Sequence, residues 1–155
     1  MSAPLVDLVN RTALCVGIAA AVYSVTVTTD APAVEVTAPC PVEFGVVDAR
    51  GAFVETDVVP LALGQEFGWQ LRVDDAAEHT WREVMVAPAA PREWIGDDLL
   101  VAGDGTMGIT ERTEAARGGM LSHSWSITEG DPGGPYVLEL FLDGQLVESR
   151  RFVVR

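Results

Sequence analysis

Apolar and polar residues alternate through the last twenty residues of the chain, on both sides of an Asp143-Gly144 dipeptide. One face of the first run is apolar and consists of Tyr136, Leu138, Leu140 and Leu142. Successive side chains of a strand point to opposite faces, so this alternation predicts a half-buried strand. Asp-Gly is typical of the two positive-φ positions of a type I′ turn, and residues 145–154 are therefore predicted to return antiparallel.

Short strands separated by turn residues are predicted from residue 42 up to this hairpin. The clearest one has an apolar face of Phe67, Trp69, Leu71 and Val73. Other candidates are Glu43–Asp48, Gly51–Val59, Trp81–Val86 and Leu121–Ile127, whereas the pattern weakens between Ala87 and Gly119. Turn signals about every 8–12 residues predict an all-β fold, an antiparallel immunoglobulin-like β-sandwich of about seven to nine strands.

An uncharged and largely apolar segment, Thr12–Val27, precedes this region. Its sixteen residues exceed the usual 7–15 of a signal-peptide core and fall short of the roughly 20 that cross a bilayer as a helix. We predict that residues 1–33 are a signal peptide or a signal anchor, that 34–41 are a linker and that 42–155 are the β-sandwich domain. A helix or strand that belongs to the soluble domain is the third interpretation of the apolar segment.

The charge distribution bears on location and partners. The net charge is −13, and all ten basic residues are arginines. Arg11 precedes the apolar segment and an acidic chain follows it, which favours a periplasmic or extracellular domain, anchored in the inner membrane if the segment is retained. Nucleic acid is not an expected partner, because phosphate recognition needs clustered basic residues. Arg150, Arg151 and Arg155 are expected to pair with carboxylates.

The polar residues do not suggest an enzyme. His79 lies in an acidic turn, and His123 alternates with Ser122 and Ser124, so these serines are expected on the opposite strand face from the histidine. The two cysteines, Cys15 and Cys40, and the two histidines lack the spacing of a metal site. We therefore expect no catalytic residues and no cofactor.

Calcium is the ligand that the sequence supports best. Asp97, Asp98 and Asp104 lie in the glycine-containing stretch 96–105 and offer hard oxygen ligands. The stretch lacks the EF-hand pattern and its glutamate at position 12. Solvent-exposed turns are the alternative explanation of these aspartates.

One tryptophan differs from the other three in its sequence context. Trp69, Trp81 and Trp125 occur in apolar strand patterns and are expected in the core. Trp94 follows Arg92-Glu93 in a region predicted to be a loop. A large aromatic side chain there is a candidate anchor for a protein partner, or it closes the open end of the sandwich.

The segment Val59–Gly68, VPLALGQEFG, resembles the central motif of a bacterial family of small exported proteins, domain-of-unknown-function family 3859. Glu43–Val47 resembles the opening strand of that family. Trp125, Gly133–Tyr136 and Leu146–Val154 resemble its closing segment. The resemblance covers roughly residues 42–155 and implies an exported β-sandwich without an assigned activity. We interpret the motif as structural, since Pro60 can end a strand and Gly64 can take a turn conformation.

These observations favour a non-enzymatic, extracytoplasmic β-sandwich that binds a protein partner in the cell envelope. Retention of residues 12–27 would make it an accessory subunit anchored to a membrane complex. The alternative is a soluble, secreted module that binds a ligand or is stabilised by calcium.

Overall fold

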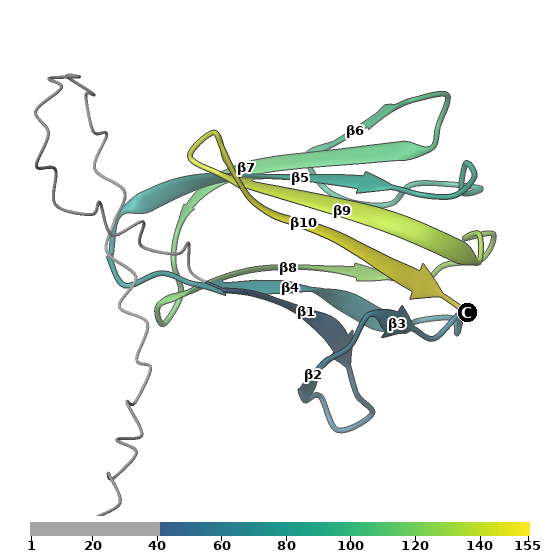
Figure 1. Ribbon diagram of the computed structural model, residues 1–155, viewed down its shortest axis with the longest axis horizontal. Helices are drawn as coiled ribbons and strands as arrows, with labels where there is room; N and C mark the ends of the chain where they lie inside the picture. The colour runs from purple at the N-terminus through teal and green to yellow at the C-terminus, as the bar shows by residue number, and fades with distance from the viewer. Residues whose placement is uncertain (1–40) are drawn as a thin grey trace, which may run out of the picture.

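The computed structural model describes residues 41–155, which form two facing β-sheets (Figure 1). The signal peptide or anchor, the linker and both cysteines lie outside the described residues. The strands are β1 Val42–Val47, β2 Phe53–Glu55, β3 Val58–Val59, β4 Glu66–Arg72, β5 Glu78–Val86, β6 Leu99–Ala102, β7 Met107–Ala115, β8 Met120–Ser126, β9 Gly134–Leu142 and β10 Gln145–Val154. Within 41–155, no helix has the length and apolar character needed to cross a membrane.

One sheet has four strands in the order β2-β1-β4-β8, and all of its pairs are antiparallel. The other has six strands in the order β3-β10-β9-β5-β7-β6, in which only β3 runs parallel to its neighbour β10. The predicted all-β sandwich is thus confirmed. The turns β4–β5, β7–β8 and β9–β10 lie at one end, on the left in Figure 1, which we call the turn end. Strands β5, β8 and β10 finish at the opposite end, which we call the open end.

The terminal hairpin has the predicted turn and register. Asp143 and Gly144 have φ values of 49° and 80°, and Gln145 pairs with Leu142. Leu138 and Leu140 are fully buried, which confirms the apolar face of the first strand.

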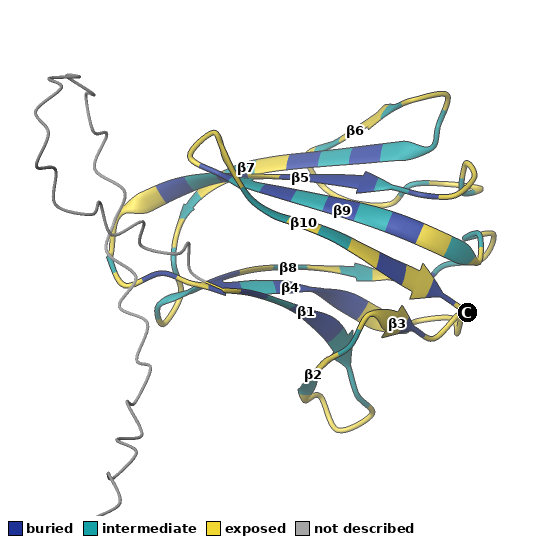
Figure 2. Cartoon of the chain, in the orientation of Figure 1, coloured by how far each residue is buried: buried dark blue, intermediate teal, exposed yellow. Residues whose placement is uncertain are grey.

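The core lies between the sheets, and buried positions alternate along the strands (Figure 2). It contains two aromatic groups. Phe44 packs on Phe152 with ring centroids 4.6 Å apart, and Tyr136 stacks on Phe152 at 5.3 Å. Trp69 meets Trp81 edge-on at 5.2 Å, which joins the two sheets.

One prediction about strands was wrong, and one region had given no clear strand prediction. The single candidate Gly51–Val59 is two strands in different sheets, because the chain crosses between the sheets at residues 56–57. The weakly patterned region 87–119 contains β6 and the nine-residue β7. Two inward positions of β7 are Gly108 and Thr110, which are not apolar, and a Cβ added to Gly108 would lie 2.8 Å from the ring of Trp94. A loop tryptophan therefore fills the space that an apolar residue of β7 would occupy.

Candidate functional site

A carboxylate lies at the centre of the core. Glu83 on β5 is fully buried, at 0% exposure, between the buried Trp81 and Met85 of the same strand face. Its Oε2 accepts a hydrogen bond from Trp69 Nε1 at 2.6 Å and one from His123 Nδ1 at 2.9 Å. Its Oε1 accepts a hydrogen bond from Trp125 Nε1. We call these four residues the Glu83 network.

The Glu83 network connects the two sheets. Glu83 belongs to the six-stranded sheet, whereas Trp69 on β4 and the two donors on β8 belong to the four-stranded one. Strands β4 and β8 approach each other closely at Gly68, where an added Cβ would lie 2.1 Å from the carbonyl oxygen of His123. Three N–H donors satisfy both carboxylate oxygens, as a buried polar group requires.

Burial limits the chemistry that this carboxylate can perform. A general acid or base must reach the proton it transfers, directly or through one water. Glu83 has no exposed surface, and its oxygens are occupied by protein donors. The arrangement suits a structural connection between the sheets better than catalysis.

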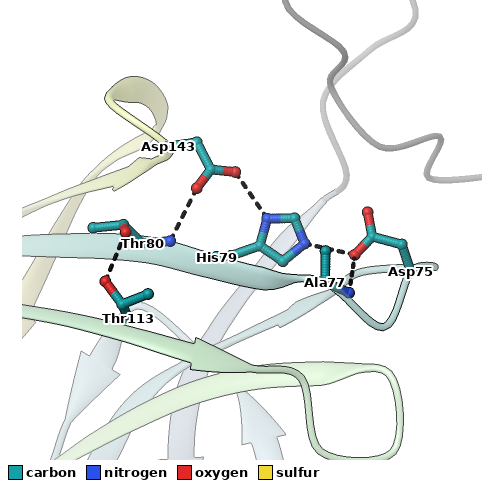
Figure 3. A network of polar contacts seen from close by, with 6 residues as sticks. All are labelled: Asp75, Ala77, His79, Thr80, Thr113 and Asp143. Atoms are coloured by element: carbon teal, nitrogen blue, oxygen red, sulfur yellow. Dashed lines mark hydrogen bonds and ion pairs between the residues drawn. The ribbon is translucent and has the colours of Figure 1, made fainter.

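A second histidine lies at the turn end, between two aspartates (Figure 3). His79 Nδ1 is 2.8 Å from Asp143 Oδ2, and its Nε2 is 2.7 Å from Asp75 Oδ1. Asp143 Oδ1 also accepts the backbone N–H of Thr80 at 2.9 Å. We call His79, Asp75 and Asp143 the His79 network; it ties the start of β5 to the β4–β5 and β9–β10 turns.

The two aspartates favour the charged imidazolium. A hydrogen bond to Asp143, together with one to Asp75, raises the pKa of His79 even though burial opposes the charge. The hydrogen bond from His79, with a smaller contribution from the Ala77 N–H, lowers the pKa of Asp75. Both ring nitrogens are thus committed to carboxylates, and neither is available as the base of a nucleophile.

The open end contains a small cavity of about 40 Å³, and Trp94 and Trp125 are among the residues that line it. The Trp94 ring lies edge-on to Trp125 at 5.7 Å, and its Nε1 donates to the carbonyl of Gly105 at 2.7 Å. Phe67, Met85 and Tyr136 also belong to the apolar wall, and the acidic lining residues are Glu93 and Asp131.

The position of Trp94 is compatible with both roles considered for it, which are closure of the open end and contact with a partner. The side chain is half-buried, packs against the core and covers Gly108, so it does close the open end. It also lines the cavity there, where a partner could reach it. Its role as a partner-binding residue stays a prediction.

The aspartates considered for calcium are not brought together. Asp98 precedes β6 and lies 3.5 Å from Arg112 Nε, whereas Asp104 lies in the turn after β6. Within residues 41–155, no three His, Cys, Asp or Glu side chains converge as a metal-binding group.

His123 is partly buried on β8. Ser122 and Ser124 are exposed on the other face of the strand, as expected. The contact of His123 with Glu83 was missed, as was Glu83 itself. The alternation of side chains along the strand contained a signal for it. Glu83 lies two residues from both Trp81 and Met85 and therefore on the same inward face of β5, where a carboxylate needs hydrogen-bond partners.

The family of the chain follows from a comparison with family models. Residues 42–155 match the model of the PM0630 beta sandwich domain. The chain belongs to this family. The match supports membership of a β-sandwich family, as the motif Val59–Gly68 implied. The matching model is that of the PM0630 domain and not that of family 3859. No curated protein matches the chain.

Solved structures resemble the domain in fold. An immunoglobulin-like protein, PA1606 of Pseudomonas aeruginosa, aligns with a TM-score of 0.50 and 21% identity, over 74% of this chain and 92% of that one. The soluble domain of PmoD from a Methylocystis species aligns with a TM-score of 0.38 and 17% identity, over 74% of this chain and 90% of that one. The PA1606 alignment shows that the fold of this PM0630-family domain is immunoglobulin-like.

Proposed function

We propose that this PM0630-family domain is a non-enzymatic, extracytoplasmic module that binds a protein partner through its open end. The observation that carries the proposal is the exposure of Leu61 and Leu63, at 46% and 75%, in the loop between β3 and β4. Exposed apolar side chains that gather beside a cavity are typical of interaction sites.

The loop with these leucines is fixed in place. Leu61 N–H donates to the Arg155 carbonyl at 2.8 Å, and Gly64 N–H donates to the Ile127 carbonyl at 2.9 Å. Gln65 Nε2 donates to the Val47 carbonyl at 2.9 Å. A loop held in this way loses little conformational entropy on binding, which favours affinity.

The loop also lies beside the cavity. Gly64 N–H donates a hydrogen bond to the carbonyl of Ile127, and Ile127 lines the cavity together with Trp94 and Trp125. The motif Val59–Gly68 therefore contains two kinds of apolar residue. Val59 and Phe67 are buried in the core, whereas the two leucines between them face solvent. The exposed leucines and the cavity thus lie on segments joined by the Gly64–Ile127 hydrogen bond, and both are offered to a partner at the open end.

Three observations support the rest of the proposal. Glu83 and His79 are engaged within the protein, which argues against catalytic use. The uncharged segment Thr12–Val27 supports export or anchoring, and with it an envelope partner. The similarity of Val59–Gly68 to the exported family 3859 agrees with that location, and we propose that the chain is related to that family as well.

Site-specific photo-crosslinking in the native host tests the contact surface. A photoreactive residue in place of Leu63 is expected to capture a discrete partner in cells. The matched control replaces Leu146, which is 53% exposed at the start of β10, at the turn end. Equal capture from both positions would contradict binding through the open end, and no capture from either would contradict the binding role.

The intact mass of the chain in membrane and soluble fractions tests the location. Full-length protein in the membrane fraction is expected if residues 12–27 are an anchor. A soluble form that begins near residue 34 is expected if they belong to a cleaved signal. Full-length protein in the cytoplasm alone would contradict the extracytoplasmic proposal.

A further inference from the structure

We infer that the cavity lined by Trp94 and Trp125 receives the side chain of an arginine from the protein partner. The inference rests on the proposed function and specifies the chemistry of the group that is bound. It follows from the size of the cavity, from its apolar wall and from the carboxylates that line it.

Size is the first constraint. The cavity of about 40 Å³ holds about three water-sized groups, since each needs roughly 10–15 Å³ by the same kind of measure. A drug-sized ligand occupies about 300 Å³ or more. The cavity thus fits the end of one side chain and not a whole small molecule.

The wall offers aromatic surface whose polar atoms are already used. Trp94 Nε1 donates to Gly105 and Trp125 Nε1 donates to Glu83. Tyr136 donates its hydroxyl hydrogen to the Pro132 carbonyl at 2.8 Å. The three rings therefore present apolar and π surface, which binds methylene groups and cations but gives no hydrogen bond to an anion.

The charges of the lining residues are all negative. Glu93 and Asp131 line the cavity, and none of the described arginines does. Asp131 Oδ2 accepts the Thr128 N–H at 2.7 Å, which fixes the carboxylate. Burial raises the pKa of Tyr136, and the Asp131 charge raises it further, so this charge acts on the cavity wall. Arg92, nearby in sequence, lies 3.5 Å from Glu129 instead.

Arginine is the side chain that meets these conditions. Its apolar stem suits the tryptophan surface, its planar guanidinium stacks on aromatic rings, and its N–H groups pair with carboxylates. A lysine ammonium is more strongly hydrated and cannot stack. An acidic side chain would be repelled by Glu93 and Asp131. The net charge of −13 also favours encounter with a basic partner segment.

An NMR titration of the full chain with N-acetyl-arginine methylamide tests the inference directly. The indole Nε1–H signals of Trp94 and Trp125 report on the cavity wall. We expect both to shift and to saturate at millimolar probe, while the signal of the buried Trp69 changes little. The matched probe is N-acetyl-citrulline methylamide, which is neutral and has nearly the same shape, and it is expected to bind at least fivefold more weakly.

Two variants test the carboxylates. Asp131→Asn and Glu93→Gln are each expected to weaken binding of the arginine probe about two- to fivefold, as partly exposed charge pairs do. Glu78→Gln, an exposed glutamate at the start of β5 and thus at the turn end, is the control and should leave binding unchanged. Equal binding of both probes, no saturation up to tens of millimolar, or an equal effect of all three variants would overturn the inference.

The outcomes separate this inference from the proposed function. Partner capture at position 63 without binding of the arginine probe would refute the arginine site and leave the module intact. Probe binding without capture at position 63 would refute the proposed function and leave a guanidinium-binding cavity.

Discussion

The two histidine–carboxylate networks use the same chemical groups in opposite ways. In the Glu83 network the acid is fully buried and three N–H donors surround it. In the His79 network the base is the buried member, and its partners Asp75 and Asp143 are 35% and 41% exposed at the side chain. Desolvation is therefore concentrated on Glu83, whereas water can replace the aspartates that contact His79. We expect the interior network to dominate stability and the one at the turn end to determine its pH dependence.

Glu83→Ala should have the largest effect. The substitution leaves two indole N–H groups and His123 without their acceptor in the core, and it opens a cavity between the sheets. We expect a loss of about 3–5 kcal/mol in the free energy of unfolding, because each unsatisfied buried donor and the cavity cost free energy. Urea denaturation checks it, with Glu111→Ala on the exposed face of β7 as the control. A loss below about 1 kcal/mol would mean that the network does not hold the sheets together.

Glu83→Gln keeps the size and shape of the side chain but replaces one carboxylate oxygen with an NH₂ group. The amide keeps one acceptor oxygen, but its NH₂ group faces a donor on the other side, because donors occupy both oxygens of Glu83. At least one indole N–H and the new amide N–H are then without an acceptor, and we expect a loss of about 2 kcal/mol. Urea denaturation of the two Glu83 variants side by side checks the order. A loss equal to that of the alanine variant would show that neither the remaining acceptor oxygen nor the retained side-chain volume contributes to stability.

The sequence predicted those parts of the fold whose signals are local. The Asp143-Gly144 turn and the alternation along β9 need only neighbouring residues, and both were confirmed. Strand β7 was missed because Trp94, a residue from a distant loop, fills the space above Gly108. Such compensation between distant segments leaves no periodic signal in the strand itself.

The candidate site was less accessible from the sequence for the same reason. The two-residue alternation of side chains along a strand is enough to place Glu83 on an inward face. Its partners, however, lie on β4 and β8 of the other sheet, so their convergence depends on how the sheets pack. His79 has one partner four residues away and another 64 residues away in a different hairpin. Only the folded register brings Asp143 next to the ring.

His79→Gln should have a smaller effect than either change at Glu83. Glutamine can still donate to one aspartate, and the partners that lose a contact are partly exposed to water. We expect a loss of about 1 kcal/mol near pH 6, in the range of hydrogen bonds discounted for screening. Urea denaturation at that pH checks it. A loss as large as that of Glu83→Ala would show that burial of the acid is not what distinguishes the two networks.

The contribution of His79 should depend on pH. Its folded pKa is raised above 6.5, so its stabilisation is complete below that pH and is lost as the pH rises through the folded value. Asp75 has a folded pKa below 3.8, so its stabilisation is lost as the pH falls toward that lower value. The stability difference between the wild type and His79→Gln is therefore expected to be largest between pH 3.8 and 6.5. A difference that grows above pH 7 would contradict the raised pKa.

Asp75→Asn should have the smallest effect on stability and should still be visible in the titration of His79. The hydrogen bond to Asp143 is the largest cause of the raised His79 pKa, and Asp143 also accepts the Thr80 N–H. NMR titration of the His79 ring protons is therefore expected to give a pKa closer to 6.5 in Asp75→Asn than in the wild type, and closer still in Asp143→Asn. The melting temperatures should fall in the same order, because the same contacts set both quantities. The reverse order would place the stronger contact of His79 in its own turn, and the terminal hairpin would then not be what holds the charged ring.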